Sequence, residues 1–253
     1  MPPIKLHILG AGNATPSTGN LYSQMALFYR QKCALVDCGN NPINPILDLG
    51  YQIDDIEHLI LTHFHPDHVA ALPNFMAELK IRGRTSPLTI HANKFTIQKI
   101  QQLIALFGLA EIPGNFPLVF HVVEDSFGAE VVTEPDFSIT AAPMIHFVPT
   151  IGLSFSRRDK SGGIAYTSDT QPCPSVALIS EGKDILIHEA TGDRPGHSSA
   201  GQAGKVAARA GVKELILIHY PTVGVDPAIW VREAEQEFAG TITLAYVSLR
   251  REF

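Results

Sequence analysis

Four side chains that can bind metal ions lie within six residues of the sequence, between positions 63 and 68. The segment Thr62-His63-Phe64-His65-Pro66-Asp67-His68 contains three histidines and one aspartate. Imidazole nitrogens and carboxylate oxygens are ligands for borderline divalent ions such as zinc, manganese and iron. Packing does not easily explain so dense a cluster of polar groups. The cluster therefore predicts a metal site, and a metal-dependent hydrolase is the first hypothesis that it supports.

Further residues of ligand type recur at one kind of place, the carboxyl end of a short apolar segment. His146, Asp169 and His219 each follow such a segment, and the pair His188-Glu189 ends another. Open α/β sheets place their binding sites at the carboxyl ends of strands. A single histidine there is commonly a buried group bonded to the backbone, but this explanation is poor for the whole set. The distant residues are therefore candidates for the same site.

The elements that must hold these residues in place form two β-rich stretches, each followed by helices. Apolar segments in the first stretch predict strands over 4–10, 23–30, 33–38, 58–62 and 88–92. Helices are expected to begin near Pro66 and to cover 94–107. The second stretch predicts strands over 118–123, 129–134, 137–145, 151–158 and 163–168. This order favours two packed sheets with helices outside.

The last part of the chain alternates between strands and helices. Strands are expected over 184–187, 214–218 and 241–247, and helices over 199–210 and 227–238. Ser199 with Gln202 three residues later predicts a capping box at the start of the first of these helices, and Gly211 predicts its end.

Length and composition indicate one ordinary globular domain over residues 1–253. Of the 253 residues, 45% are hydrophobic and 17% are charged, as is usual for globular proteins. A chain of this length can bury one large core. No apolar run approaches the length of a membrane span, and the N-terminus lacks the features of a secretion signal. The three cysteines, Cys33, Cys38 and Cys173, form no C-x-x-C pair, which argues against a cysteine zinc site. We therefore expect a cytoplasmic protein with no membrane partner.

The net charge limits the partners that the surface can attract. The formal charge is −6 and the pI is near 6.0, so any binding of a nucleic acid has to be local. Small basic groups of this size are usually solvated, and we expect this of the two in the chain. These groups are Lys80, Arg82 and Arg84 after a helix, and Arg157, Arg158 and Lys160 at the end of a hairpin.

The dense cluster resembles the H-x-H-x-D-H signature of the metallo-β-lactamase superfamily, and the distant residues are similar to its remaining ligands. This resemblance implies an α/β (α+β) fold, a four-layer αββα sandwich with two divalent ions in one site. Zinc is the metal expected, with manganese or iron as alternatives. The ligands so implied are His63, His65 and His146 for one ion, Asp67, His68 and His219 for the other, and Asp169 as a bridge.

Segments of both halves also resemble ribonuclease Z, the family of tRNA 3′-processing endoribonucleases within that superfamily. His188-Glu189-Ala190-Thr191 and His197-Ser198-Ser199 are similar to its H-E-A-T and H-S-T elements. Segments 10–16, 36–39 and 165–170 also resemble it, so the similarity covers nearly the whole chain. The resemblance implies a phosphodiester substrate, either a small molecule or an RNA 3′ end, and a homodimer.

The chain departs from that family at places that bear on the substrate. Only the 22 residues 147–168 separate His146 from Asp169, which leaves no room for the long arm with which bacterial ribonucleases Z grip tRNA. Asn40 follows Gly39, where an acidic residue is usual, and Ser199 stands where the motif has threonine. The segment after His219 lacks the usual Ser/Arg-Tyr. The chemistry is therefore supported better than the substrate.

The implied ligands lead to a mechanism. Two cations roughly 3.5 to 4 Å apart clamp an in-line displacement and lower the pKa of a bridging water, which supplies hydroxide as the nucleophile. His197 is the candidate general acid for the leaving group, and Glu189 would accept the other ring N–H of His197. Asp67 is a ligand that also steers the nucleophile. His188 is expected to be structural.

Two other functions fit parts of the pattern. Another hydrolase of the superfamily, acting on lactones, thioesters or sulfate esters, would use the same ligands, although Glu189 and His197 favour phosphodiesters. A di-iron redox or sensor protein would resemble H-x-E-x-D, with a carboxylate at the position of His65. The neutral imidazole at this position suits hydrolytic zinc or manganese better than iron.

Four histidines fall outside all these motifs. They lie within or beside predicted strands, and we expect them to have no nearby acidic partners, so we assign them no role. They are His7, His58, His91 and His121.

Overall fold

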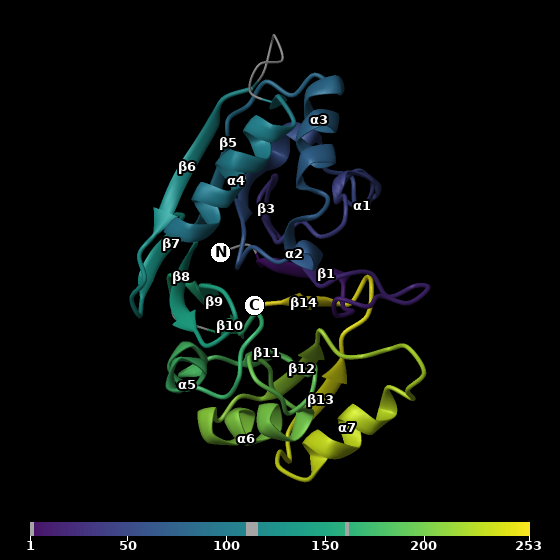
Figure 1. The fold of residues 1–253 in the computed structure, drawn as a ribbon. Helices are drawn as coiled ribbons and strands as arrows, with labels where there is room; N and C mark the ends of the chain where they lie inside the picture. Colours follow the sequence, from purple (N-terminus) through teal and green to yellow (C-terminus); the bar gives the residue numbers. More distant parts are fainter. Residues whose placement is uncertain (1–2, 110–115, 160–161) are drawn as a thin grey trace.

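Two seven-stranded sheets form the centre of the computed structural model, which describes residues 3–109, 116–159 and 162–253 (Figure 1). The first sheet has the spatial order β14 (Arg250–Glu252), β1 (Lys5–Gly10), β2 (Gln24–Tyr29), β3 (Lys32–Val36), β4 (Ile56–Ile60), β5 (Leu88–Asn93) and β6 (Leu118–Val123). The second has the order β13 (Thr241–Leu244), β12 (Glu214–Ile218), β11 (Ile185–Glu189), β10 (Gly163–Tyr166), β9 (Thr150–Arg157), β8 (Phe137–Met144) and β7 (Ala129–Thr133). The chain therefore builds most of one sheet, then the other, and returns to the first for β14.

Helices cover the outer face of each sheet, as Figure 1 shows above and below the strands. The first sheet is covered by α1 (Ile43–Asp48), α2 (Pro66–Val69), α3 (Leu72–Ile81) and α4 (Lys94–Leu106), and a 3₁₀ helix, Ile53–Asp55, precedes β4. The second is covered by α5 (Pro174–Ser180), α6 (Ala200–Ala210) and α7 (Ala228–Glu235). The four-layer αββα sandwich, an α/β fold, is thereby confirmed.

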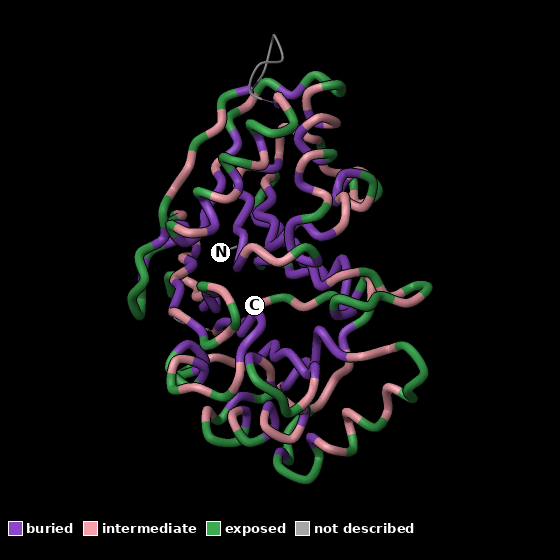
Figure 2. Tube along the Cα trace, viewed as in Figure 1, coloured by how far each residue is buried: buried purple, intermediate pink, exposed green. Residues whose placement is uncertain are grey.

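Side chains that alternate along the strands build three apolar layers. In β12, Ile216 and Ile218 pack between the two sheets, whereas Leu215 and Leu217 pack under the helices. In β4, Ile60 faces the other sheet and Leu59 faces the helices. Strands that are covered on both faces are apolar throughout, which is why these segments were recognisable in the sequence. In Figure 2 the buried residues accordingly concentrate along the strands.

The strands next to the candidate residues point the same way within each sheet. In the first sheet β3, β4, β5 and β6 are parallel, and in the second β10, β11, β12 and β13 are parallel. β9 is antiparallel to both β8 and β10, so β8 runs in the direction of β10. The carboxyl ends of β8, β10, β11 and β12 therefore share one edge of the second sheet.

The expected strands are confirmed, and so are the caps of α6. The Ser199 hydroxyl accepts from the Gln202 N–H while the Gln202 side chain accepts from the Ser199 N–H, and Gly211 closes the helix with a φ of 68°. The helix expected from Pro66 is split, because α2 ends at Val69 and α3 begins only at Leu72. Four short elements had no strong periodicity and were missed, namely α1, the 3₁₀ helix, α5 and β14.

The structure corrects the expectation of a solvated basic group after α3. Arg84 is buried, and its guanidinium donates to the backbone carbonyls of Ile53, Ile56 and Pro87. These carbonyls satisfy the buried charge, so this side chain cannot serve a nucleic acid. Lys160 of the second basic group lies outside the described residues.

No helix in the described parts of the chain is both long enough and apolar enough to cross a membrane.

Candidate metal centre

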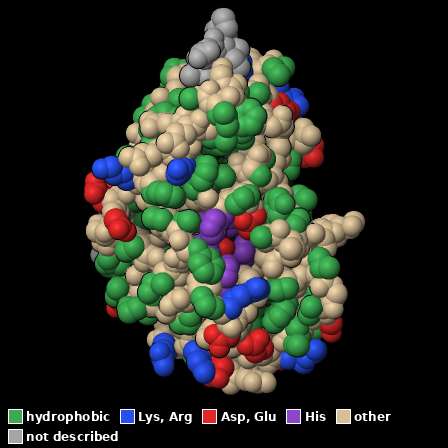
Figure 3. Space-filling model, in the orientation of Figure 1, with side chains coloured by type: hydrophobic (Ala, Val, Ile, Leu, Met, Phe, Trp, Pro, Cys, Tyr) green, Lys and Arg blue, Asp and Glu red, His purple; other side chains and the backbone are tan. Residues whose placement is uncertain are grey.

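The seven residues proposed as ligands lie together where strand ends of the two sheets meet. In Figure 3 the histidines gather in the middle of one face, with acidic side chains among them. The loop after β4 in the first sheet provides His63 and His65, and the short helix α2 that follows provides Asp67 and His68. The second sheet provides His146 after β8, Asp169 after β10 and His219 after β12.

Three of the histidines form a first group. His65 Nδ1 lies 3.1 Å from His63 Nε2 and 3.0 Å from His146 Nε2. Asp169 Oδ2 lies 3.9 Å from the Nε2 atom of His63 and 3.8 Å from that of His146. Ligand atoms at such separations can share one divalent ion with metal–ligand bonds of about 2 Å.

Asp67, His68 and His219 form a second group. His219 Nε2 lies 3.1 Å from Asp67 Oδ2, and His68 Nε2 lies 3.5 Å from the same oxygen. Asp169 also reaches this group, with Oδ1 3.6 Å from His68 Nε2 and Oδ2 3.4 Å from His219 Nε2. The carboxylate of Asp169 therefore lies between the two groups, where a bridging ligand is expected.

Hydrogen bonds to Nδ1 fix the rings of His68 and His146. His68 Nδ1 donates to Asp37 Oδ2 at 2.8 Å, and His146 Nδ1 donates to the carbonyl of Gly196 at 2.7 Å. With Nδ1 occupied in this way, the Nε2 lone pair of each ring is the one available to the centre of the cluster.

Threonine hydroxyls orient two more rings. The Thr191 hydroxyl donates to the carbonyl of His219 and so accepts from His219 Nδ1, at 2.8 Å. The Thr62 hydroxyl donates to the Asp37 carboxylate and so accepts from His63 Nδ1, at 3.1 Å. These partners again leave Nε2 for the cluster, which is the arrangement typical of metal-binding histidines.

Two buried polar atoms at the centre have no hydrogen-bond partner among the described residues. They are His68 Nε2 and Asp169 Oδ1, which lie 3.6 Å apart. An unpaired buried polar group is costly, and a cation between these atoms would satisfy both. The donor set of imidazoles and carboxylates therefore fits divalent ions.

Charges in the cluster favour a cation. Burial lowers the pKa of His63 well below its ordinary value, so this ring is neutral. Burial also opposes protonation of His68, but the charges of Asp37 and Asp169 outweigh it and raise the pKa of His68 to about 10. The pKa of Asp67 is lowered despite burial, because His219 donates a hydrogen bond to it and His68 lies nearby. The pKa of His219 is also raised, because Asp169 and Asp67 outweigh its burial, so the carboxylates of the second group attract positive charge.

Unusual backbone conformations occur where strands meet the site. Asp37, Ser168 and His219, which follow or nearly follow β3, β10 and β12, have positive φ angles of 63°, 53° and 56°. Residues with a side chain rarely adopt this conformation, which costs on the order of 1–3 kcal/mol at each position. Such strain is typical of functional sites, and nothing in the sequence indicated it.

Glu189 is buried and holds His197 in place. Glu189 Oε1 accepts from His197 Nδ1 at 3.0 Å and from the backbone N–H of Thr170 at 3.0 Å, while Oε2 accepts from the N–H of Thr191 at 2.9 Å. Since Nδ1 of His197 is engaged by Glu189, its Nε2 is free for a substrate. The sequence-predicted pair therefore has the geometry of an oriented acid or base.

A tight turn delivers His197 to the cluster. The backbone N–H of His197 donates to the carbonyl of Arg194 at 3.0 Å, which closes a turn over Pro195 and Gly196. Proline followed by a residue with positive φ, here 76° at Gly196, is the signature of a type II turn. The sequence Arg-Pro-Gly-His thus encodes the local geometry, although it was not recognised as a turn.

A pocket of about 230 Å³ opens on the cluster and is also lined by residues to which the sequence analysis gave no role in the site. Arg194 lines it from the turn, with Nη2 donating to the carbonyl of Thr191 at 2.9 Å. Asn13 and Thr15 line it from the loop after β1. No motif marked Arg194, and the only signal that could have found it was its place three residues before His197.

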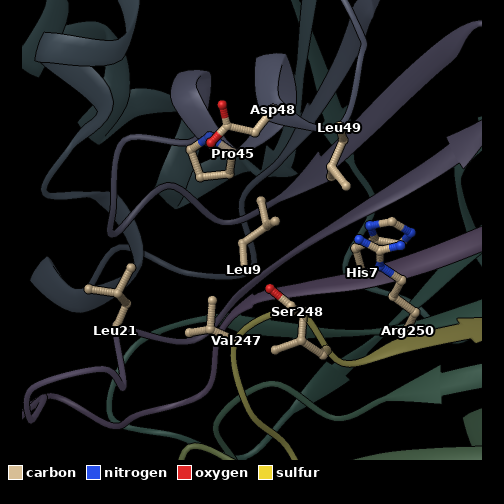
Figure 4. A pocket seen from close by; sticks show the side chains of 10 residues that line it. His7, Leu9, Leu21, Pro45, Asp48, Leu49, Val247, Ser248 and Arg250 are labelled. Carbon is tan, nitrogen blue, oxygen red and sulfur yellow. The ribbon is translucent and has the colours of Figure 1, made fainter.

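A second pocket, of about 320 Å³, lies between β1, α1 and β14 and is mostly apolar (Figure 4). Leu9 lies in its middle, Asp48 at one side, and His7 beside Arg250 at the other. His7 and Asp48 are its only lining residues of metal-ligand type, and they do not approach each other. This pocket is therefore not a second metal site.

Three histidines without an assigned role form a chain across the first sheet. His58 Nδ1 lies 3.0 Å from His91 Nε2, and His91 Nδ1 lies 2.8 Å from His121 Nδ1. The expectation that they lack an acidic partner is wrong for His58, because the fold brings Glu134 Oε1 to 3.7 Å from its Nε2. His58 and His121 approach opposite nitrogens of His91, so the three rings do not converge on one ion.

His188 makes a contact within its own strand. It is buried, and its Nδ1 donates to the backbone carbonyl of Glu189 at 2.7 Å. This contact fits the structural role expected for it.

Comparison with protein families gives a match over most of the chain. The sequence model described as the β-lactamase superfamily domain matches residues 34–220. This range includes all seven candidate ligands as well as Glu189 and His197.

Similar proteins extend the match beyond that range. Ribonuclease Z of Parabacteroides distasonis is 26% identical over 297 aligned residues, covering 96% of this chain and 97% of the relative. The metallo-beta-lactamase fold protein YhfI of Bacillus subtilis has a TM-score of 0.84 at 24% identity over the full length of both chains. The short form of human tRNase Z has a TM-score of 0.78 at 21% identity, covering 98% of each chain. The two structures share the fold of this protein.

Proposed function

Because the chain belongs to the β-lactamase superfamily and is a metal-dependent hydrolase of the metallo-β-lactamase fold, we propose that it cleaves phosphodiesters at the cluster described above. The observation that carries this proposal is the buried Glu189, which holds His197 beside the candidate ligands. Hydrolysis of an activated ester needs no general acid, because its leaving group departs without a proton. Hydrolysis of a phosphodiester with a poor leaving group does need one.

We propose two divalent ions in this centre, zinc being the first choice and manganese or iron the alternatives. The two groups of donor atoms around Asp169 support two ions rather than one. Bound ions would act as Lewis acids on the phosphoryl oxygens of the substrate and would lower the pKa of a bound water. The proposed ligands are His63, His65 and His146 in one group, Asp67, His68 and His219 in the other, and Asp169 in both.

The chain's own residues then direct the substrate and the protons. In the doubly protonated form, His197 donates the proton on Nε2 to the leaving oxygen, while Nδ1–H stays bonded to Glu189, so the ring that remains is the neutral tautomer with hydrogen on Nδ1. Asp67, close to His68 and His219, is placed to orient the attacking water as well as to bind an ion. Arg194 supplies a positive charge in the same pocket for a non-bridging phosphate oxygen.

The guanidinium in the pocket favours phosphodiesters over the alternatives. Lactones and thioesters carry no charge at the bond that breaks, so they gain little from Arg194. Sulfate esters are anionic and stay as the runner-up. A redox role for a di-iron centre is disfavoured by the imidazole of His65, for the reason given from the sequence.

Two classes of phosphodiester remain, an RNA 3′ end and a small molecule. The similarity to ribonuclease Z supports RNA. However, the aligned span of 297 residues exceeds the 253 residues of the chain, so the relative contains segments that this chain lacks. Between His146 and Asp169 the described residues form the strands β9 and β10 and no further helix or strand. We therefore propose phosphodiester cleavage as the function and an RNA 3′ end as its first candidate substrate.

The test is a parallel assay of three substrates with the metal-loaded protein: a precursor tRNA, a dinucleotide and bis(p-nitrophenyl) phosphate. We expect turnover of at least the two small diesters, loss of it on chelation, and its loss in His65→Ala. Cleavage of the precursor tRNA as well would identify RNA as the substrate. Absence of turnover on all three, with two metal ions bound per chain, would refute the proposal.

A further inference from the structure

A phenylalanine beside the candidate metal centre is exposed to solvent. Phe147 directly follows His146 in the loop between β8 and β9, and it is 66% exposed. Ile145, on the other side of His146, is 48% exposed. Single exposed apolar residues are common, but here two flank a candidate ligand, and one of them, Phe147, lies against His197, which lines the pocket over the cluster.

The ring of Phe147 is held by the turn that carries His197. A Cβ atom added at Gly196 would lie 2.9 Å from Phe147 Cε2, so the ring packs directly on the glycine backbone. The carbonyl of the same glycine accepts from His146 Nδ1 at 2.7 Å. The two loops therefore fix each other, and Gly196 is needed both for the turn and for the close approach of the ring.

This packing places an aromatic ring next to the candidate general acid. The ring centroid of Phe147 lies 5.1 Å from that of His146 and 6.1 Å from that of His197. His197 is inclined by 65° to the Phe147 ring, so the two do not stack on each other. The exposed part of the Phe147 ring stays available to a molecule that enters the pocket.

We propose that Phe147 stacks against the nucleobase of the nucleoside that carries the leaving oxygen. This inference rests on the proposed function, because His197 marks the side of the leaving group only if it protonates the leaving oxygen. A base attached through its sugar to that oxygen lies within reach of a ring adjacent to His197. Stacking on an aromatic side chain tolerates any base, since each base has a π face.

The consequence is a preference for nucleoside leaving groups over leaving groups that lack a planar ring. Arg194, at the start of the same turn, can contact the phosphate while Phe147 contacts the base. Loss of one base–aromatic stack is expected to weaken binding roughly 5- to 100-fold. The effect belongs mainly in KM, because stacking is made before and during the chemical step.

The experiment compares two substrates in the wild-type protein and in Phe147→Ala, both loaded with metal. One substrate is a dinucleoside monophosphate, and the other is the same compound with an abasic ribose on the leaving side. In the wild-type protein, removal of the base is expected to raise KM roughly 5- to 100-fold. In Phe147→Ala the two KM values should become nearly equal, which is the signature of a direct contact in a double-mutant cycle.

Further variants separate stacking from simple packing. Phe147→Trp should retain the preference for the base, and Phe147→Leu, which is apolar but not planar, should lose most of it. Phe107→Ala is the matched control, because Phe107 is also largely exposed, at 58%, but lies beyond the carboxyl end of α4. This control should retain the wild-type preference.

The outcomes distinguish the two proposals. If the wild-type protein hydrolyses bis(p-nitrophenyl) phosphate, the dinucleoside monophosphate and its abasic counterpart, the proposed function stands. If the base-dependent ratio of KM values is then the same in the wild-type protein and in Phe147→Ala, the stacking inference is wrong. It is also wrong if Phe147→Leu keeps the full preference. If no diester is turned over, the proposed function fails first.

Discussion

Asp37 is a single carboxylate on which two candidate ligands depend. It is fully buried, with Oδ2 accepting from His68 Nδ1 and Oδ1 accepting from the backbone N–H of Thr62 at 2.8 Å. Through the Thr62 hydroxyl it also orients His63. Asp37 is not among the ligands that we propose, but it sets the direction of two rings that are.

Replacement of this carboxylate should weaken metal binding without unfolding the protein. In Asp37→Asn the amide nitrogen cannot accept from either His68 or Thr62, so one of these bonds is lost. Partners of this kind contribute about 10- to 100-fold to metal affinity. Titration against a competing chelator, with circular dichroism as the check on folding, measures the effect. Asp136→Asn, which alters only the ion pair with Arg30 nearer the surface, is the control. Equal affinities in wild type and Asp37→Asn would contradict the role assigned to Asp37.

If His197 protonates the leaving oxygen, the rate lost on replacing His197 should depend on the leaving group of the substrate. His197→Ala should lower kcat about 10²- to 10⁴-fold for a dinucleotide, whose leaving alkoxide needs a proton. The same variant should lose much less on bis(p-nitrophenyl) phosphate, because p-nitrophenolate leaves without one. Glu189→Gln should show the same pattern in weaker form, since it releases the orientation of His197. Equal losses on both substrates, or loss of bound metal, would assign His197 a different role.

At this scale the sequence revealed the candidate ligands and the pair of Glu189 and His197, but not every residue that positions the ligands. His63, His65, Asp67 and His68 were visible because four ligand types lie side by side. Asp37 and Arg194 were not, because single residues gain their meaning only from neighbours that the fold supplies. The positive φ of His219 was equally hidden, since backbone strain is imposed by tertiary structure.

Among the elements, the parallel strands β4 and β5 carry a pair of histidines, the buried His91 and the half-buried His58, that should make stability depend on pH. Burial, together with nearby His58 and His121, lowers the pKa of His91 to about 3. In the unfolded chain the pKa returns to its ordinary value near 6.5. Above pH 6.5 the ring is neutral in both states and adds no pH dependence. Below it, the unfolded chain binds a proton that the folded protein resists, so stability falls.

His91→Gln should therefore flatten the acid side of the stability profile. Between pH 6.5 and about 4, one proton corresponds to a slope of at most about 1.4 kcal/mol per pH unit, and the variant should lack much of that slope. Urea unfolding at a series of pH values measures it, with chelator present in both proteins so that metal release does not contribute. If both proteins show the same slope, His91 does not titrate as the structure indicates.

Prediction of the elements succeeded where a periodic signal was long. The capping box of α6 and the apolar strand β12 were both evident. The three-residue strand β14 was not, because it is too short to show alternation and exists by pairing with β1. The turn at Gly196 had its turn residues in the sequence, but its importance depends on Phe147 and His146, which are about fifty residues away in the chain.

In the whole molecule, the two sheets share one apolar layer, and we propose that residues 1–253 act as a single domain. Ile60 of the first sheet and Ile218 of the second belong to the same buried cluster. The sequence indicated two packed sheets but not which strands would be neighbours, since strand order depends on contacts between distant segments. The Glu134 partner of His58 was missed for this reason. The homodimer implied by the resemblance stays a prediction, which sedimentation equilibrium can check.

The two sheets contribute unequal and complementary sets of donors to the centre, His63 to His68 from one and His146, Asp169 and His219 from the other. Neither half can therefore assemble a working centre when it is separated from its partner. An ion bound by the proposed ligands would link the two sheets, so hydrolysis would report whether the sheets are packed together. If the two sheets separated partly, the enzyme would lose activity while most of its secondary structure remained.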